Sequence, residues 1–238
     1  EQGYELTPSG VRVIQAVLAG AVSEAPSVEP TEIDERCYHC GSRILQGYTD
    51  GRPAIYCRGC EGNYDISTPE LADRLGSVAL ARELNVKEIG ELPPAGVEGR
   101  TAAELHWVTV VWNHLQFFAT GSDICPRCSA VLEPAVEVCT THDSTDGVCE
   151  TCGNLQAIMY HTGCTNCVFS MEGLFSYRLL SHTAMLDFLT DHGLNPIAPT
   201  SPETFWGYLT PYDEEIISTD PFEARFQFSL PDESLSLT

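Results

Sequence analysis

The sequence predicts an α+β protein made of several small modules. Ten of its 11 cysteines fall in five Cys-x-x-Cys pairs, a spacing typical of zinc-binding turns. Residues 102–119 form one long apolar segment that predicts a buried helix, and residues 204–238 contain four short strand-like stretches separated by turns. We therefore expect zinc ribbons, a helical segment, and a small unit of helix and antiparallel sheet.

The chain is strongly acidic. Its 238 residues include 34 Asp and Glu against 12 Lys and Arg, which gives a net charge of −22, and Lys87 is the only lysine. Acids spread over loops and helix faces, with lysine avoided, suit a cytoplasm of molar salt, where charges are screened within about 3 Å. We expect a halophilic, cytoplasmic protein; the alternatives are an acidic mesophilic protein or a binder of basic partners. No apolar run reaches the roughly 18 residues of a membrane span, and no signal peptide is recognisable.

Residues 1–20 are expected to form a strand, a turn and a helix. Tyr4 and Leu6 alternate as in a strand, and a helix begins at Thr7-Pro8 and stops at Gly20. The phrase GYELTPSG resembles the second wing strand and the closing helix of a winged helix-turn-helix domain. The alternative is an incidental strand and helix.

The resemblance to a winged helix implies that DNA is read by a recognition helix N-terminal to Glu1, outside this chain. Arg12 would then be at most a phosphate contact, and it is more simply a solvated helix residue. The stretch that follows, 21–36, is rich in Pro, Ser and Glu without periodicity, so it is predicted to be a linker.

Residues 37–66 have the pattern of a zinc ribbon. Two Cys-x-x-Cys turns flank two alternating strands, and Asp50-Gly51 between the strands is a strong hairpin signal. A hairpin of this kind brings four thiolates to the tetrahedral corners that zinc prefers. His39, inside the first turn, is not expected to be a ligand. The predicted ligands of this first site are Cys37, Cys40, Cys57 and Cys60.

The segment 67–122 is predicted to be helical. Capping-box spacing starts one helix at Ser67 and a second at Thr101, and the second runs to about Ala119. Its circumference is mostly apolar, so it is expected to be buried and to contribute to a dimer interface. His106 and His114 lie eight positions apart with no cysteine or carboxylate at helical spacing, so packing is a simpler role for them than metal binding.

The module 123–172 carries the remaining cysteines. Cys139 is the only cysteine outside a Cys-x-x-Cys pair, and His142 stands at the matching spacing, so the odd cysteine count needs no free thiol. His161 lies three residues before Cys164, in a pair that is already complete. Eight ligands make two zinc sites: Cys125, Cys128, Cys139, His142, Cys149, Cys152, Cys164 and Cys167.

Sequential, cross-braced and nested pairings all satisfy the ligand count of this module. We favour nesting, because two strand-like stretches of similar length, AVLEPAVEV and NLQAIMYH, can pair antiparallel. That pairing places one site at the base of a long ribbon and the other at its tip. The cross-braced alternative resembles ubiquitin-ligase RING domains, although the spacing between His142 and Cys149 is longer than that pattern usually has.

All three zinc ions are expected to be structural. A catalytic zinc keeps one coordination position open for water, whereas each site here has four protein ligands. The deaminase signature, paired catalytic carboxylates, a Ser-His-Asp set and a Gly-rich phosphate loop are not found, so we expect no enzyme activity and no other cofactor. The alternative is metal or redox sensing by the site at the tip.

Residues 173–238 are predicted to be a small α+β unit. A helix is expected between an N-cap at Ser181 and a C-cap at Gly193, with His182 and His192 at its ends as cap or surface residues. Four strands are predicted after it, in TFWGYL, EEIIST, ARFQFSL and SLSLT.

The whole chain resembles haloarchaeal winged-helix transcriptional regulators, loosely of the ArsR type, with a cysteine-rich C-terminal region. The resemblance rests on GYELTPSG, VEPTEIDERCYHCG, CPRC, CTTHD and CTNC. It implies transcription regulation by a homodimer that binds DNA through its winged helix, while the cysteine-rich region dimerises, senses a signal or contacts the transcription machinery. The alternative is a zinc-ribbon adaptor that binds proteins and no DNA.

Overall fold

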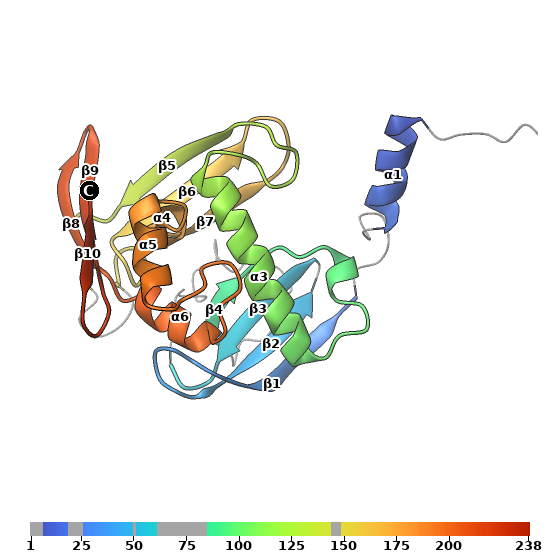
Figure 1. Cartoon of the computed structure of the whole chain (residues 1–238), viewed down its shortest axis with the longest axis horizontal. Coiled ribbons are helices and arrows are strands. Elements are labelled where there is room, and N and C mark those ends of the chain that lie inside the picture. Colours follow the sequence, from blue (N-terminus) through green and yellow to red (C-terminus); the bar gives the residue numbers. More distant parts are fainter. Residues whose placement is uncertain (1–6, 19–25, 50, 61–84, 144–148) are drawn as a thin grey trace, which may run out of the picture.

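In the residues that the structure describes, the fold is a mixed α+β arrangement of three small antiparallel sheets and the helices beside them (Figure 1). The computed structural model describes residues 7–18, 26–49, 51–60, 85–143 and 149–238. Within these ranges there are five α-helices. The strand expected at Tyr4 and Leu6 and the helix expected to start at Ser67 lie outside the described residues. In the part of the chain described, no helix is long and apolar enough to cross a membrane.

Helix α1 spans Pro8–Leu18, close to the helix predicted from the Thr7-Pro8 start. Its first turn is capped by the side chain of Thr7, which accepts a hydrogen bond from the Gly10 N–H at 3.1 Å. None of its residues is buried, and Figure 1 shows it standing apart from the rest of the fold.

The first sheet has the strand order β1-β2-β3-β4. Strands β2 (Arg43–Thr49) and β3 (Arg52–Cys57) form the predicted hairpin, in which Gly51 has a φ of +80° that a side chain would disfavour. Strand β4 (Asn85–Ile89) was not predicted and adds to β3 at the far edge.

Part of the predicted linker is wrong. Residues 28–36 form strand β1 (Val28–Arg36), which pairs with β2. Only Ile33 in this strand is buried, so the stretch lacks the alternation that would have identified it. It is an irregular edge strand that tolerates a proline at position 30. Glu32 and Asp34 face solvent and pair with Arg43, whereas Glu35 is half-buried, which raises its pKa.

Helix α3 (Ala102–Gly121) links the first sheet to the second. The predicted capping box is present, with Thr101 and Glu104 exchanging hydrogen bonds, and the helix continues two residues beyond the predicted end. His106 binds the Gln46 side chain on β2, and His114 binds the Pro196 carbonyl, at 3.2 and 2.8 Å from their Nδ1 atoms. Both rings are buried, and burial lowers the pKa of each to about 4, so both histidines pack in their neutral form.

The second sheet, β5-β6-β7, is the predicted long ribbon with a third strand added. Strands β5 (Leu132–Val138) and β6 (Ile158–Cys164) pair antiparallel over their full length, with Leu132 opposite Cys164 and Val138 opposite Ile158. Strand β7 (Ser170–Leu174) pairs with β6 on the other side.

The C-terminal residues contain three helices and the third sheet. Helix α4 (Phe175–Leu179) was not predicted, and the N-cap of α5 (Thr183–Asp191) is His182 rather than Ser181, because the His182 ring accepts the Ala184 N–H. Gly193 follows α5 with a φ of +71°, as expected past a helix end.

The strand predicted in TFWGYL is wrong. Residues 202–209 form helix α6 (Pro202–Leu209), with Ser201 as N-cap and Pro202 in the first turn. Phe205, Trp206 and Leu209 are buried at helical spacing, so burial on one helix face outweighs the strand preference of the aromatic residues. The other three predicted strands are present as β8 (Asp213–Thr219), β9 (Phe222–Ser229) and β10 (Ser234–Leu237).

The largest hydrophobic core joins α3, β6, the C-terminal helices and the third sheet. Phe117 of α3 stacks on Tyr177 of α4, and both contact Trp206 of α6. The Arg178 guanidinium binds the Asp123 carboxylate at 2.8 Å and the Tyr160 hydroxyl at 3.1 Å, which ties α4 to β6 and to the turn after α3.

A half-buried carboxylate connects the third sheet to the second. Glu214 on β8 accepts the backbone N–H groups of Ala157 and Ile158 at 2.8 and 3.2 Å. Burial raises its pKa to about 7, and the two hydrogen bonds only partly oppose this. The raised pKa means that folding favours the protonated acid, so this contribution to stability is complete below about pH 4.5 and is lost as the pH rises to about 7.

We expect Glu214→Gln to remove this pH dependence. Its free energy of unfolding, relative to that of the wild type, should rise by about 1–3 kcal/mol between pH 4.5 and 7.5, because the wild type must bury a charge and the variant does not. Urea titrations at a series of pH values measure this difference. Glu215→Gln, on the same strand but exposed, is the control and should show no such rise; equal pH profiles for the two variants would contradict the assignment.

Candidate metal centres

The first centre, Cys37, Cys40, Cys57 and Cys60, joins the turn after β1 to the end of β3. The Sγ atoms of Cys37 and Cys60 are 3.7 Å apart, and those of Cys40 and Cys57 are 3.5 Å apart. Gly59 gives room for this approach, since a Cβ there would lie 2.9 Å from the Cys40 sulfur.

The base centre, Cys125, Cys128, Cys164 and Cys167, lies at the end of the β5-β6 ribbon where Leu132 is opposite Cys164. Its Sγ separations are 3.6 Å between Cys125 and Cys167 and 3.5 Å between Cys128 and Cys164. Cys128 and Cys164 are 36 residues apart in the sequence, and the register of β5 and β6 brings their two Cys-x-x-Cys turns together.

The tip centre, Cys139, His142, Cys149 and Cys152, lies at the opposite end of the same ribbon. The His142 Nδ1 atom is 3.5 Å from the Cys152 sulfur, while Nε2 lies 3.2 Å from the Leu155 carbonyl. A hydrogen bond from Nε2 to that carbonyl leaves Nδ1 free to bind a metal, the usual way in which proteins orient a ligating imidazole.

Three of the cysteine turns share one backbone geometry. In each turn, the carbonyl of the first cysteine accepts a hydrogen bond from the N–H of the residue four positions later. The N–H of the same cysteine donates to the carbonyl of the residue five positions later. The residue four positions on has a positive φ: Gly41 at 69°, Ser129 at 60° and Gly153 at 70°. The glycine after two Cys-x-x-Cys pairs is therefore part of the metal-binding turn, and Ser129 adopts the same conformation at a cost.

The twelve residues predicted as ligands form three tetrads, with the ligand atoms of each tetrad within 4.8 Å of one another. Four sulfurs bound to one zinc at about 2.3 Å would lie about 3.8 Å apart, so separations of 3.5–3.7 Å fit a tetrahedral metal site. The structure has the nested arrangement of the eight later ligands rather than a sequential or cross-braced one.

The thiols of the base and tip centres differ in pKa, since burial and neighbouring thiols raise the pKa of Cys152 to about 12, while hydrogen bonds lower the pKa of two other thiols. The Ala130 backbone N–H lowers the pKa of Cys128 to about 6, and the Asp143 N–H does the same for Cys149. Metal ions bind thiolates, so a lowered pKa favours the form that coordinates.

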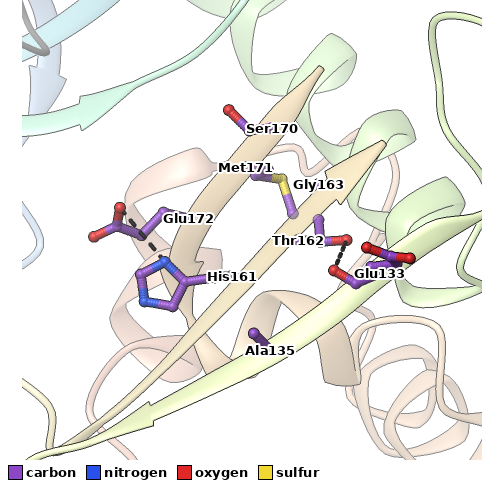
Figure 2. Close-up of a pocket in the computed structure, with 8 residues that line it drawn as sticks. All are labelled: Glu133, Ala135, His161, Thr162, Gly163, Ser170, Met171 and Glu172. Atoms are coloured by element: carbon purple, nitrogen blue, oxygen red, sulfur yellow. Dashed lines mark hydrogen bonds and ion pairs between the residues drawn. The ribbon is translucent and has the colours of Figure 1, made fainter. Parts of the chain in front are cut away.

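His39 and His161 lie outside the three tetrads, as expected. His161 Nε2 is 3.2 Å from the Glu137 carboxylate, and Nδ1 is 3.6 Å from that of Glu172. The ring borders a hollow of about 220 Å³ on one face of the second sheet, walled by Glu133 and Glu172 and floored by Gly163 (Figure 2). Both ring nitrogens thus face carboxylates, one on each neighbouring strand of the sheet.

Lys87 is a neighbour of the first centre that the sequence did not reveal. Its side chain is buried, with Nζ 3.9 Å from the Cys60 sulfur and 4.6 Å from the centre of the Tyr38 ring. Burial lowers its pKa, and the four nearby thiols oppose that effect. The one available signal was that the chain has a single lysine.

Comparison with known proteins identifies a family but no function. A family model described as a domain of unknown function, DUF7351, matches residues 34–238, which include all three tetrads. No curated protein and no solved structure matches the chain.

Paired substitutions test the nested pairing. Cys139→Ser combined with Cys149→Ser should remove one zinc per chain, because both residues belong to the tip centre, whereas Cys139→Ser combined with Cys128→Ser should remove two. Native mass spectrometry of the zinc-loaded protein counts the metals. Loss of two zinc ions from the Cys139→Ser/Cys149→Ser variant would show that the ligands pair differently, since the cross-braced arrangement loses two in both variants and the sequential one reverses the ranking.

Proposed function

Because the chain belongs to the DUF7351 family, whose function is unknown, we propose a function from its own residues: a zinc-stabilised dimerisation or partner-binding region of a DNA-binding transcription regulator. The observation that carries the proposal is the closure of all three tetrads by four protein ligands each. A zinc without an open coordination position stabilises a fold and does not activate water. We therefore assign structural zinc to the centres and no enzyme activity to the region.

An exposed apolar face on α3 supports dimerisation. Trp107 and Leu115 are 42% and 46% exposed, and Val111 and Phe118, half-buried, continue the same face. The 18 residues from Leu105 to Ser122 include no Asp, Glu, Lys or Arg, in a chain whose net charge is −22. Two copies of this helix can pack antiparallel without bringing like charges together, and in a two-fold arrangement the same face of each copy then meets the other.

DNA binding is assigned to the winged-helix part of the protein, to which residues 1–20 are similar. The described helix α1 agrees with the closing helix of that motif, and the acidic modules after it are poorly suited to phosphate contact, since nucleic-acid affinity normally depends on clustered Lys and Arg. The same acidity favours a second candidate function, a zinc-ribbon adaptor that binds proteins only.

A charge placed on α3 should break the dimer. We expect Leu115→Glu to shift the protein from dimer to monomer in molar KCl, since each copy would have to bury an unpaired carboxylate in an apolar interface. Size-exclusion chromatography with light scattering measures the mass. The control is Ile217→Glu on β8, because Ile217 is 44% exposed and so matches Leu115; this variant should stay dimeric. A monomeric wild type would show that α3 is not a dimer interface.

DNA binding separates the two candidate functions. For a regulator, the native gene product should show saturable fluorescence anisotropy with DNA from upstream of its own gene in molar KCl. Zinc content and circular dichroism establish that the protein is loaded and folded. An absence of binding by such protein would favour the adaptor.

A further inference from the structure

The three centres differ in their charge environment, and this difference rests on one residue. We propose that Lys87 neutralises part of the negative charge of the first centre and makes its thiolates less reactive toward electrophiles than those of the base centre. The inference depends on the proposed occupancy of the centres by zinc. It assigns a positioning role to the only lysine in the chain.

The placement of Lys87 supports this role. It lies on β4, next to an irregularity in the pairing with β3, and its side chain is 2% exposed. The ammonium is directed at the Cys60 sulfur, 3.9 Å away, with the Tyr38 ring beside it. In the described part of the chain, it is the only buried lysine or arginine side chain. Because the charge is buried, salt screens its effect on the thiolates little.

The other two centres have no equivalent cation within the described residues. Four thiolates and one Zn²⁺ give a formal charge of roughly −2, which an ammonium reduces to roughly −1 at the first centre, as the neutral His142 does at the tip centre. Near the base centre, Arg127 is 45% exposed and forms an ion pair with Glu91 at 2.6 Å. The base centre therefore keeps the largest uncompensated negative charge.

Cys40 and Cys128 allow a matched comparison. Each is the second cysteine of the first Cys-x-x-Cys pair in its centre, and each is exposed. Cys40 Sγ lies 3.5 Å from Cys57, and Cys128 Sγ lies 3.5 Å from Cys164. Since position and exposure are similar, a difference in reactivity between them would reflect the charge of the centre to which they belong.

Iodoacetamide is a suitable probe of this difference. The thiolate attacks the methylene carbon, a carbon–sulfur bond forms, and iodide leaves with the bonding electron pair. The resulting thioether is a weaker zinc ligand, so alkylation is followed by metal release. A nearby positive charge lowers the electron density on the sulfur and slows this attack.

The test compares zinc-loaded wild type, Lys87→Met and Lys87→Arg. We expect Lys87→Met to speed alkylation of Cys40 on the order of tenfold, while Cys128 and the tip centre keep their rates, and Lys87→Arg to stay near the wild type. Peptide mass spectrometry follows each cysteine, and the Co²⁺-substituted proteins should retain tetrahedral spectra with a shifted sulfur-to-metal band. An unchanged rate at Cys40, or an equal acceleration at all three centres, would overturn the proposal.

The wild type alone gives a second test, should Lys87→Met fail to fold. In the loaded wild type, Cys128 should be alkylated faster than Cys40, and equal or reversed rates would overturn the role of Lys87. Zinc content is measured first. A wild type that binds fewer than three zinc ions refutes the proposed zinc occupancy itself, which is distinct from a loaded protein in which Lys87 has no effect.

Discussion

The proposed metal at the cysteine tetrads is the interaction on which, in our account, the two ribbon sheets depend. Beside the first centre, the buried cluster consists of Ile33, Ile44 and Ile55 together with two of the cysteines themselves, and beside the base centre it consists of Leu132, Phe169 and Cys125. Cores of this size bury too little apolar surface to offset the chain entropy of the strands they hold. At the proposed sites, a metal ion that binds only the folded arrangement would contribute the missing free energy.

The C-terminal half has a different basis of stability. Its core contains 18 buried residues drawn from α3, β6, three helices and the third sheet, with stacked aromatic rings at the centre. Helix α3 takes part in both halves, since His106 binds Gln46 on β2 while Phe117 packs in the large core. One helix, without charged side chains from Leu105 onward, thus fixes the first ribbon relative to the rest and still presents a face to solvent.

The sequence revealed the ligands because metal-binding spacing is local. Each Cys-x-x-Cys turn is set by five or six consecutive residues, and Asp50-Gly51 specifies its hairpin in the same local way. The features that it did not reveal depend on distant contacts. Strand β1 has one buried side chain and is recognised only by its pairing with β2, and TFWGYL is helical because its aromatic residues pack on α3. Lys87 shows its role only when β4 is placed beside the first centre, 27 residues from Cys60.

The central claim is that metal at the tetrads holds the ribbons folded. Hydrogen exchange of the zinc-loaded protein in molar KCl, before and after removal of zinc with a chelator, tests it most directly. The account predicts that amides of β2, β3 and β5 lose protection on chelation, while those of β9, within the large core, keep it. Unchanged protection of β2, β3 and β5 after complete removal of zinc would contradict the account.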